Sequence, residues 1–439
     1  MRIRSTQVVT PQGTCAATIV VDGETIAAIE PFGEADVDYG DLVVLPGIVD
    51  SHVHVNEPGR TEWEGFETVT DAAAAGGVTT IVDMPLNSIP ATTTLEALHI
   101  KQEALAGKCS VDVALWGGVV PGNVDELRPM IDAGARGFKC FLVEPGVDEF
   151  PHVDEGQLRA AARELAGTGV PLLVHAELPG PIAGARGAIA GADPNAYGTW
   201  LHSRPNHAED EAIELLLRVC EDTGARIHVV HLSSASALPL LAHARKAGLP
   251  LSAETTPHYL HFHAEQIPPG RTEFKCAPPI REHANRERLW EALRDGLLEL
   301  VVSDHSPCTP ALKAGTFNDA WGGIASVQLI LPVVWSEARA RRFDVEALAQ
   351  WLCAGPARLA GLTRKGAIAA GNDADFCVFA PEETFTVTPE LIRHRHKVTP
   401  YLGETLHGVV KAAWLRGRCV YPERSEGPTA PQRHGRLLR

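Results

Sequence analysis

The chain alternates between short apolar runs and longer stretches rich in alanine, leucine and glutamate. About eight apolar runs in its middle part begin near Val43, Thr79, Val111, Ala135, Pro171, Arg226, Pro250 and Glu299. Stretches of helical character separate them, such as TLEALHIKQEALAG and AEDEAIELLLRVCEDTG. This alternation is typical of a parallel sheet, and eight units predict an α/β fold of the (β/α)8 barrel type. An open doubly wound sheet is the alternative, but no glycine-rich phosphate loop follows the first strand.

The two ends of the chain have a different pattern. Residues 1–46 hold short strand-like runs such as RIRSTQVVT and CAATIVVDG, and similar runs return after residue 371 in DADFCVFAP and GVVKAAWLRG. Neither end is long enough for a stable sheet alone, so we expect both to form one small β-sandwich domain. The predicted organisation is residues 1–46 for its first part, 47–370 for the barrel and 371–439 for its second part. That last segment includes a polar, proline-rich tail to which we assign no catalytic part.

Composition excludes several classes of partner. The 439 residues carry a formal net charge of -16, which argues against binding to nucleic acid or to an anionic membrane. No apolar run approaches the length of a transmembrane span, and the N-terminus lacks the features of a signal peptide. Nine cysteines without a CxxC pair are typical of reduced thiols. We therefore expect a cytoplasmic protein without a nucleic-acid or membrane partner.

Metal-capable side chains occur at the ends of several predicted strands. In the run VVLPGIVDSHVH, His52 and His54 project to the same side of a strand, and two such imidazoles can grip a metal ion. Four later runs each carry one further candidate: Lys139 in ARGFKCFL, His175 in PLLVHAE, His231 in ARIHVVHL and Asp304 in ELVVSDHSPC. These residues fall on strands one, four, five, six and eight. Barrel enzymes place their chemistry at the C-terminal ends of the strands, so we expect one shared site there.

Taken singly, these residues also have structural interpretations. The HxH pattern occurs two more times, as His261/His263 and as His394/His396. We expect the former pair in a loop that could line the site, and the latter, in IRHRHKV, on a solvated face. His175 and His231 could each be core histidines bonded to a carbonyl group. Metal binding is the stronger interpretation only because several such residues occur together, each near the end of a different predicted strand.

Lys139 stands in a strand with almost no other charge. A buried ammonium group without a partner is costly, so the simpler interpretation is a salt bridge to an acid that lines the barrel. The alternative is that CO₂ adds to the neutral amine and gives a carbamate that bridges two metal ions. Asp304 likewise could cap a turn, or it could bind metal and carry a proton from the attacking water to the leaving nitrogen. With the histidines in view, we favour the carbamate and the catalytic aspartate.

These residues together resemble the amidohydrolase superfamily, in its cyclic amidase branch. The longer segments HVHVNEPGRTEWEGFET, DMPLNSIP, GFKCFL, TTPHYL, KCAPPIRE and SDHSPC are similar to the allantoinase family, and the resemblance covers nearly the whole chain. It implies a metal-dependent hydrolase that opens the hydantoin ring amide of allantoin to give allantoate, in purine breakdown, through a hydroxide that bridges two metals. It also implies a homotetramer.

The resemblance assigns roles to the metal-capable residues. It places His52 and His54 on the more buried of two divalent metals, with His175 and His231 on the second. Lys139, carboxylated on its side-chain nitrogen, bridges the two metals, and Asp304 binds metal and acts as the base. Zinc is the first expectation, while iron, cobalt or manganese are alternatives because such donor sets accept them all.

The expected substrate is a small cyclic ureide. Dihydroorotases have an arginine where this chain has Asn56, and hydantoinases carry a tyrosine soon after the bridging lysine, which is absent here. Further contacts are expected from Asn87, Ala277, Gly322 and Gly323. A D-hydantoinase, a dihydropyrimidinase or a dihydroorotase remains the enzymatic alternative, and a non-catalytic scaffold of the same fold is a remote one. Arg60 could pair with Glu62 or Glu64, or meet substrate.

Overall fold

A small sheet domain contains strands from both ends of the chain. The computed structural model describes residues 1–422 and 433–439. The N-terminal strands are β1 (Arg2–Thr10), β2 (Gly13–Asp22), β3 (Thr25–Pro31), β4 (Val37–Asp38) and β5 (Val43–Pro46). The C-terminal strands are β14 (Phe376–Thr386), β15 (Thr405–Leu415) and β16 (Arg418–Tyr421). The main path of the sheet runs β16-β15-β14-β5-β1-β2-β3, with β4 paired to β1, so the predicted pairing of the two ends is confirmed.

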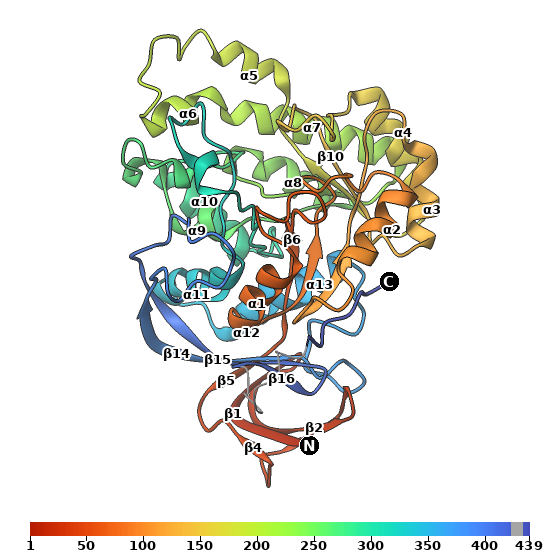
Figure 1. Ribbon diagram of the computed structural model, residues 1–439, viewed down its shortest axis with the longest axis vertical. Helices are drawn as coiled ribbons and strands as arrows, with labels where there is room; N and C mark the ends of the chain where they lie inside the picture. Colours follow the sequence, from red (N-terminus) through yellow and green to blue (C-terminus); the bar gives the residue numbers. More distant parts are fainter. Residues whose placement is uncertain (423–432) are drawn as a thin grey trace.

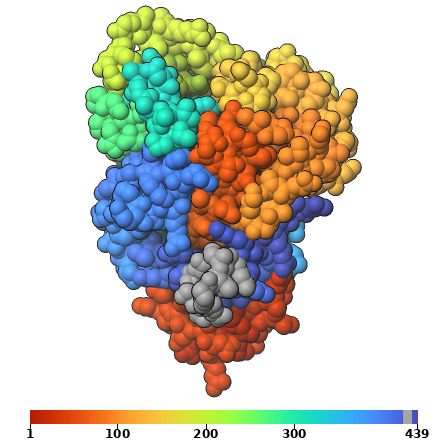
Figure 2. Space-filling view, in the orientation of Figure 1, coloured from red at the N-terminus to blue at the C-terminus, as the bar shows by residue number. Residues whose placement is uncertain are grey.

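This sheet has a hydrophobic core of its own. The cluster includes Ile19 from β2, Val44 from β5, Phe376 from β14 and Trp414 from β15, all of them buried. Strands β1 and β2 lie at the bottom of the molecule and β14 to β16 lie between them and the barrel (Figure 1). Figure 2 shows the N-terminal segment in red at that same end. Neither end could bury these side chains without the other.

The barrel begins directly after β5 in the chain. Its strands are β6 (Ile48–Val53), β7 (Val78–Asp83), β8 (Asp112–Leu115), β9 (Gly117–Gly118), β10 (Phe138–Phe141), β11 (Leu172–His175), β12 (Ile227–Val229) and β13 (Leu251–Ala253). All their pairings are parallel, and β8 and β9 are two parts of the predicted third strand. The eighth strand is present only as isolated bridges, Thr255 with Val301 and Val53 with His305, which join the last unit to its two neighbours. The predicted barrel is confirmed.

Helices cover the outside of this barrel (Figure 1). They are α1 (Phe66–Ala75), α2 (Leu95–Ala104), α3 (Leu127–Asp132), α4 (Glu155–Leu165), α5 (Pro179–Ala185), α6 (Tyr197–Ser203), α7 (Asn206–Thr223), α8 (Leu238–Lys246), α9 (Pro257–His261), α10 (His283–Arg294), α11 (Ile330–Ala340), α12 (Val345–Leu348) and α13 (Gly355–Leu359). Local chemistry sets several ends. A capping box between Asp154 and Gln157 starts α4, and Gly224 ends α7 with a positive φ of 66°. Among the helices described, none is both long and apolar enough to cross a membrane.

The last seven residues return to the barrel. Leu437 forms a parallel bridge with Val113 of β8, and the backbone N–H of Gly435 donates to the carbonyl of Cys109. Most of the polar tail, residues 423–432, lies outside the described residues, so the expectation that it has no catalytic part is not tested there. The described end of the tail contacts the start of β8, away from the C-terminal ends of the strands.

Candidate active site

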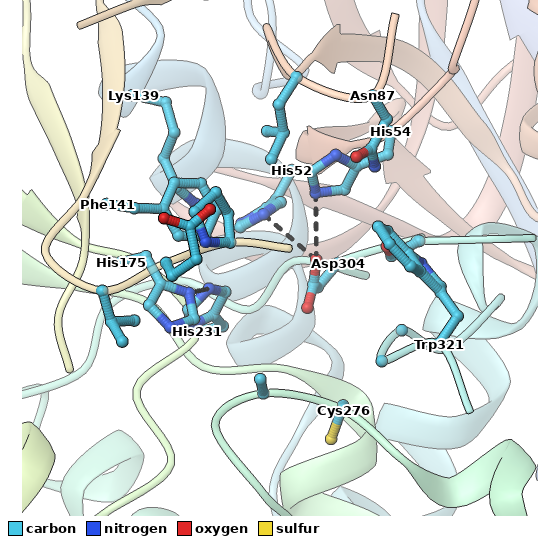
Figure 3. Close-up of a pocket in the computed structure, with 18 of the residues that line it drawn as sticks. His52, His54, Asn87, Lys139, Phe141, His175, His231, Cys276, Asp304 and Trp321 are labelled. Atoms are coloured by element: carbon cyan, nitrogen blue, oxygen red, sulfur yellow. Dashed lines mark hydrogen bonds and ion pairs between the residues drawn. The ribbon is translucent and has the colours of Figure 1, made fainter. Parts of the chain in front are cut away.

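A pocket lies at the C-terminal ends of the barrel strands, and Figure 3 shows it from close by. The hollow measures about 630 Å³. All six predicted metal ligands line it: His52, His54, Lys139, His175, His231 and Asp304. Strand alternation explains this convergence, because each strand directs one or two side chains inward at its end.

One half of the pocket groups His52, His54 and Asp304. The Asp304 Oδ1 atom lies 3.2 Å from His52 Nε2 and 3.6 Å from His54 Nε2. One possible ligand atom from each of the three residues falls within 4.8 Å of the others, and all three residues are buried. Within the described residues, neither His52 Nε2 nor His54 Nδ1 has a hydrogen-bond partner. Asp304 has a positive φ of 45°, a conformation that costs a non-glycine residue energy and often marks a functional position.

The other half groups His175 and His231. The His175 Nδ1 atom lies 3.0 Å from His231 Nε2, so two ring nitrogens converge on one point. His175 Nε2 contacts Glu177 at 2.6 Å, and Glu177 also accepts a hydrogen bond of 2.5 Å from Arg204. The His52 and His231 rings are 5.4 Å apart between centroids, which brings the two halves into one cluster.

Burial keeps these imidazoles neutral. It lowers the pKa of His52 and His231 well below the usual range, and the neighbouring cationic forms of Lys139 and His175 act in the same direction. Burial also lowers the pKa of His175, although Glu177 opposes the effect. A metal binds only the neutral imidazole, so these shifts favour ligation at neutral pH.

Lys139 is buried without an ionic partner. Its side chain is 1% exposed, and in residues 1–422 and 433–439 no carboxylate lies within ion-pair distance of its ammonium group. Its nitrogen lies 5.0 Å from the centroid of the Phe141 ring. Burial lowers the pKa of Lys139 to about 8, although Asp304 and Glu254 oppose the shift. The expected simple salt bridge is therefore not formed, and part of the amine is neutral near physiological pH.

The donor set of this pocket fits divalent metal ions. Buried ring nitrogens are normally hydrogen-bonded, yet in the part of the chain that the structure describes no partner is found for His52 Nε2, His54 Nδ1 or His231 Nδ1. Imidazole and carboxylate donors suit zinc and other first-row metals. Metal binding would give partners to these ring nitrogens. It also agrees with the nearby Asp304 carboxylate and with a lysine that forms no ion pair.

Four of the five predicted substrate contacts line the pocket. They are Asn87, Ala277, Gly322 and Gly323, whereas the side chain of Asn56 donates to the carbonyl of Pro307 at 3.3 Å and is not part of the lining. The Oδ1 atom of Asn87 is buried and has no hydrogen-bond partner among residues 1–422 and 433–439. Gly323 has a φ of 153°, and a Cβ atom there would lie 2.5 Å from the Ser306 carbonyl oxygen, so a larger residue would disturb this wall.

Several lining residues were not predicted. Phe141, Arg204, Ser306 and Trp321 line the pocket as well. Phe141 could have been inferred from alternation, because it lies two residues after Lys139 on the same strand. Arg204 and Trp321 lie in long connections, where no periodic pattern shows which side chains turn inward.

Three expectations about other polar residues are wrong. His261 contacts Glu337 at 2.9 Å and lies outside the pocket, because α9 turns it toward α11. His394 is fully buried rather than solvated, because its ring packs 5.4 Å from that of His305. Arg60 pairs with Glu149 rather than with Glu62 or Glu64, since the loops after β6 and β10 meet.

Comparison with known proteins agrees with this fold and site. The sequence model of the amidohydrolase family matches residues 43–420. The L-hydantoinase (dihydropyrimidinase) structure from Arthrobacter aurescens superposes with a TM-score of 0.92 at 30% identity, covering 99% of each chain. The pocket and the barrel are thus those of a cyclic amidase type.

Curated relatives indicate which branch of the amidohydrolase family this chain belongs to. The allantoinase of Streptomyces avermitilis is 53% identical over 427 residues, which cover 95% of this chain and 94% of that protein. The allantoinase of Saccharomyces cerevisiae is 46% identical over 385 residues, 86% of this chain and 82% of that protein. The chain belongs to the amidohydrolase family and, within it, to the allantoinases. The resemblance inferred from the sequence motifs is confirmed.

Proposed function

We propose that this protein hydrolyses the ring amide of allantoin and releases allantoate. The observation that carries the proposal is the convergence of six metal-capable side chains in one pocket of a chain that belongs with the allantoinases. Its substrate is a small molecule, which would bind in this pocket beside the six side chains.

Two divalent metal ions complete the site in this proposal. His52 and His54 would hold one ion and His175 and His231 the other, while Lys139, as its carbamate, would bridge them. The missing salt bridge of Lys139 and its lowered pKa support this role, since only a neutral amine adds CO₂. Zinc is the first choice of metal, with iron, cobalt or manganese as alternatives. Bound there, the metals would acidify the attacking water and polarise the ring carbonyl.

Asp304 is the proposed general base and acid. One oxygen of its carboxylate contacts both histidines of the first half, and Asp304 lines the pocket (Figure 3). It would accept a proton from the attacking water and return it to the ring nitrogen as the amide C–N bond breaks. Asn87, with its unpartnered oxygen, would accept a hydrogen bond from a ring N–H, and the backbone at Ala277, Gly322 and Gly323 would hold the ureido groups.

No covalent intermediate is required in this scheme. Cys308 lies close after Asp304 in the sequence and is a candidate nucleophile, but burial raises the pKa of its thiol. A thiol that holds its proton is a poor nucleophile. We therefore assign Cys308 to packing.

The assembly and location are part of the same proposal. We propose a homotetramer in the cytoplasm, in keeping with the family resemblance and the cysteine pattern of the sequence. Size-exclusion chromatography with light scattering tests the assembly, and a monomeric, fully active enzyme would contradict it.

A substrate panel tests the activity. Metal-replete protein should turn over allantoin much faster than hydantoin, dihydrouracil or dihydroorotate, and Asp304→Asn should abolish turnover while it leaves the fold intact. The structural likeness to a hydantoinase makes hydantoin the strongest competitor. Brisk hydantoin turnover without allantoin turnover would replace the proposal with a hydantoinase activity.

A further inference from the structure

Glu254 is a buried carboxylate that touches both halves of the candidate site without lining the pocket. It directly follows β13, and its side chain is fully buried. Its Oε1 atom lies 2.5 Å from His52 Nδ1 and accepts the backbone N–H of His231 at 3.4 Å. One carboxylate therefore contacts a proposed ligand from each half.

The other oxygen of Glu254 continues this chain of contacts into the barrel. Its Oε2 atom lies 3.1 Å from His228 Nε2, and His228 Nδ1 lies 2.8 Å from the hydroxyl of Ser252. His228 and Ser252 are register partners on β12 and β13, so their side chains point to the same side of the sheet. The series of contacts Ser252–His228–Glu254–His52 thus links β13 to the His52 ring and holds Glu254 in place.

We propose that Glu254 is a positioning residue that keeps the proton of His52 on Nδ1 and thereby directs the free Nε2 lone pair into the pocket. An ionised carboxylate only accepts hydrogen bonds, so the ring nitrogen beside it must carry the hydrogen. The opposite nitrogen, His52 Nε2, has no hydrogen bond and lies 3.2 Å from Asp304 Oδ1. The inference rests on the proposed metal site and adds to it a group outside the ligand set.

The consequence concerns metal affinity. Without Glu254, the neutral ring can carry its proton on Nε2, and that tautomer cannot bind a metal through the nitrogen that faces the pocket. The loss of such a supporting partner typically weakens metal binding by about 10- to 100-fold. A role in packing alone would lower the stability of the fold but leave the tautomer of His52 unchanged.

Zinc titration of metal-free protein against a competing chelator tests the proposal. Glu254→Leu removes both acceptor oxygens and should weaken zinc binding by about 100-fold, whereas Glu254→Gln should weaken it by about 10-fold. The smaller effect is expected because glutamine keeps one oxygen for His52, while its amide can donate to His228 once the His228 proton moves toward Ser252.

Asp50→Asn is the matched control. Asp50 is also fully buried, and its Oδ1 atom accepts the backbone N–H groups of His52 at 3.3 Å and of Ser303 at 3.1 Å. It does not touch the His52 ring, so its amide variant should bind zinc within about twofold of the parent protein. An equal loss of affinity in this variant would overturn the proposal.

Nitrogen NMR of labelled histidine supplies a second readout. His52 of the metal-free parent protein should show its proton on Nδ1, and the Leu variant should shift toward the Nε2–H form. Unchanged zinc affinity in both Glu254 variants would overturn the proposal, as would unchanged affinity in Glu254→Gln if the Leu variant does not fold. Because zinc affinity is measured without substrate, a failure here is distinct from a failure to turn over allantoin.

Discussion

Two buried clusters in this molecule each bring three possible metal ligands together. His52, His54 and Asp304 form the first, in the pocket, and Asp112, Asp373 and Asp375 form the second. In both clusters one ligand atom from each residue falls within 4.8 Å of the others. The second cluster lies where β8 begins and where the chain re-enters the small sheet domain before β14.

The two clusters differ in whether lysine or arginine side chains pair with their carboxylates. Lys365 Nζ sits among the three aspartates at 2.7 Å from Asp112, 3.0 Å from Asp373 and 2.7 Å from Asp375, and Arg416 also pairs with Asp112. Burial acts against it, yet the three carboxylates raise the pKa of Lys365. In the pocket cluster, Asp304 contacts only His52 and His54 among the ion pairs of the described residues, and Lys139, which lines the same pocket, forms no ion pair with it. Proximity of ligands alone therefore does not define a metal site, because the charge balance around them decides.

The largest expected effect comes from removing the lysine of the pocket. Lys139→Ala should lose its metals and lower allantoin turnover by more than about 100-fold, because the proposed bridge is gone. Metal analysis and turnover assays measure the two losses together. Short-chain carboxylic acids should restore part of both by taking the place of the carbamate. Full metal content and activity in the variant would remove Lys139 from the site.

The lysine of the aspartate cluster, Lys365, should contribute to stability and not to turnover. Lys365→Met removes the cation that balances three buried carboxylates, so the free energy of unfolding should fall by about 3–5 kcal/mol. Denaturant unfolding of the parent and variant proteins measures the difference. Turnover per folded molecule should not change, because the cluster lies away from the pocket.

The same variant tests whether Lys365 is what keeps metal ions out of the aspartate cluster. With Lys365 gone, the three carboxylates become an oxygen site of the kind that calcium or manganese prefers. Millimolar calcium should then raise the Tm of Lys365→Met and leave that of the parent protein unchanged. A variant that calcium does not stabilise would show that the aspartate geometry itself is unsuitable.

His394 shows that a buried ring nitrogen without a hydrogen-bond partner does not by itself indicate a metal site. Both its ring nitrogens are buried and have no hydrogen-bond partner in the described parts of the chain. Burial, with help from His305, lowers the pKa of His394 to about 3. An unfolded histidine has a pKa near 6.5, so below that pH the unfolded state binds a proton that the folded state does not. Stability therefore falls as the pH drops from about 6.5 toward 3, by about 1.4 kcal/mol per pH unit for this one group.

Urea unfolding between pH 7 and pH 5 measures this dependence. His394→Leu should reduce the slope of stability against pH by about 1.4 kcal/mol per unit. The partly exposed His396 is the control, since His396→Gln should leave the slope as it is. An unchanged slope in His394→Leu would mean that His394 is protonated in the folded state.

The smallest effect is expected at Arg60, which contacts Asn87, a residue that lines the pocket. Arg60 pairs with Glu149, donates to the Asn87 carbonyl at 2.8 Å and lies 5.1 Å from the ring of Trp63. Arg60→Met should raise the KM for allantoin by about 3- to 10-fold and leave kcat nearly unchanged, because a partly exposed hydrogen-bonded pair contributes about 1 kcal/mol. Glu149→Gln should act alike, and the double variant should be little worse than either single one. Additive effects would show that the two side chains act independently.

Much of this architecture could be read from local patterns. The barrel follows from the alternation of apolar runs and helices, and the six side chains of the pocket follow from their places near strand ends. The first strand shows where such a reading is too coarse. The apolar run that begins at Val43 predicts the first barrel strand, although the predicted domain boundary falls after residue 46. In the structure, residues 43–46 join the small domain as β5 and only residues 48–53 belong to the barrel.

Other parts of the site carry no local signal. Glu254 lies 202 residues from His52 in the chain, and nothing near either residue predicts that they meet. Arg204 and Trp321 enter the pocket from connections whose paths depend on what they pack against. The charged neighbours of His394 predict a solvated side chain, yet its own side chain is turned into the protein.

The sequence by itself determined which side chains reach the C-terminal edge of the barrel, because strand alternation and the order of the strands are local properties. Only the tertiary structure decided which of those side chains lack partners. Pairing depends on residues that are distant in the chain and close in space, as Lys365 shows among its aspartates and Glu254 beside His52. Those distant partners distinguish a neutralised cluster from one that can hold metal ions.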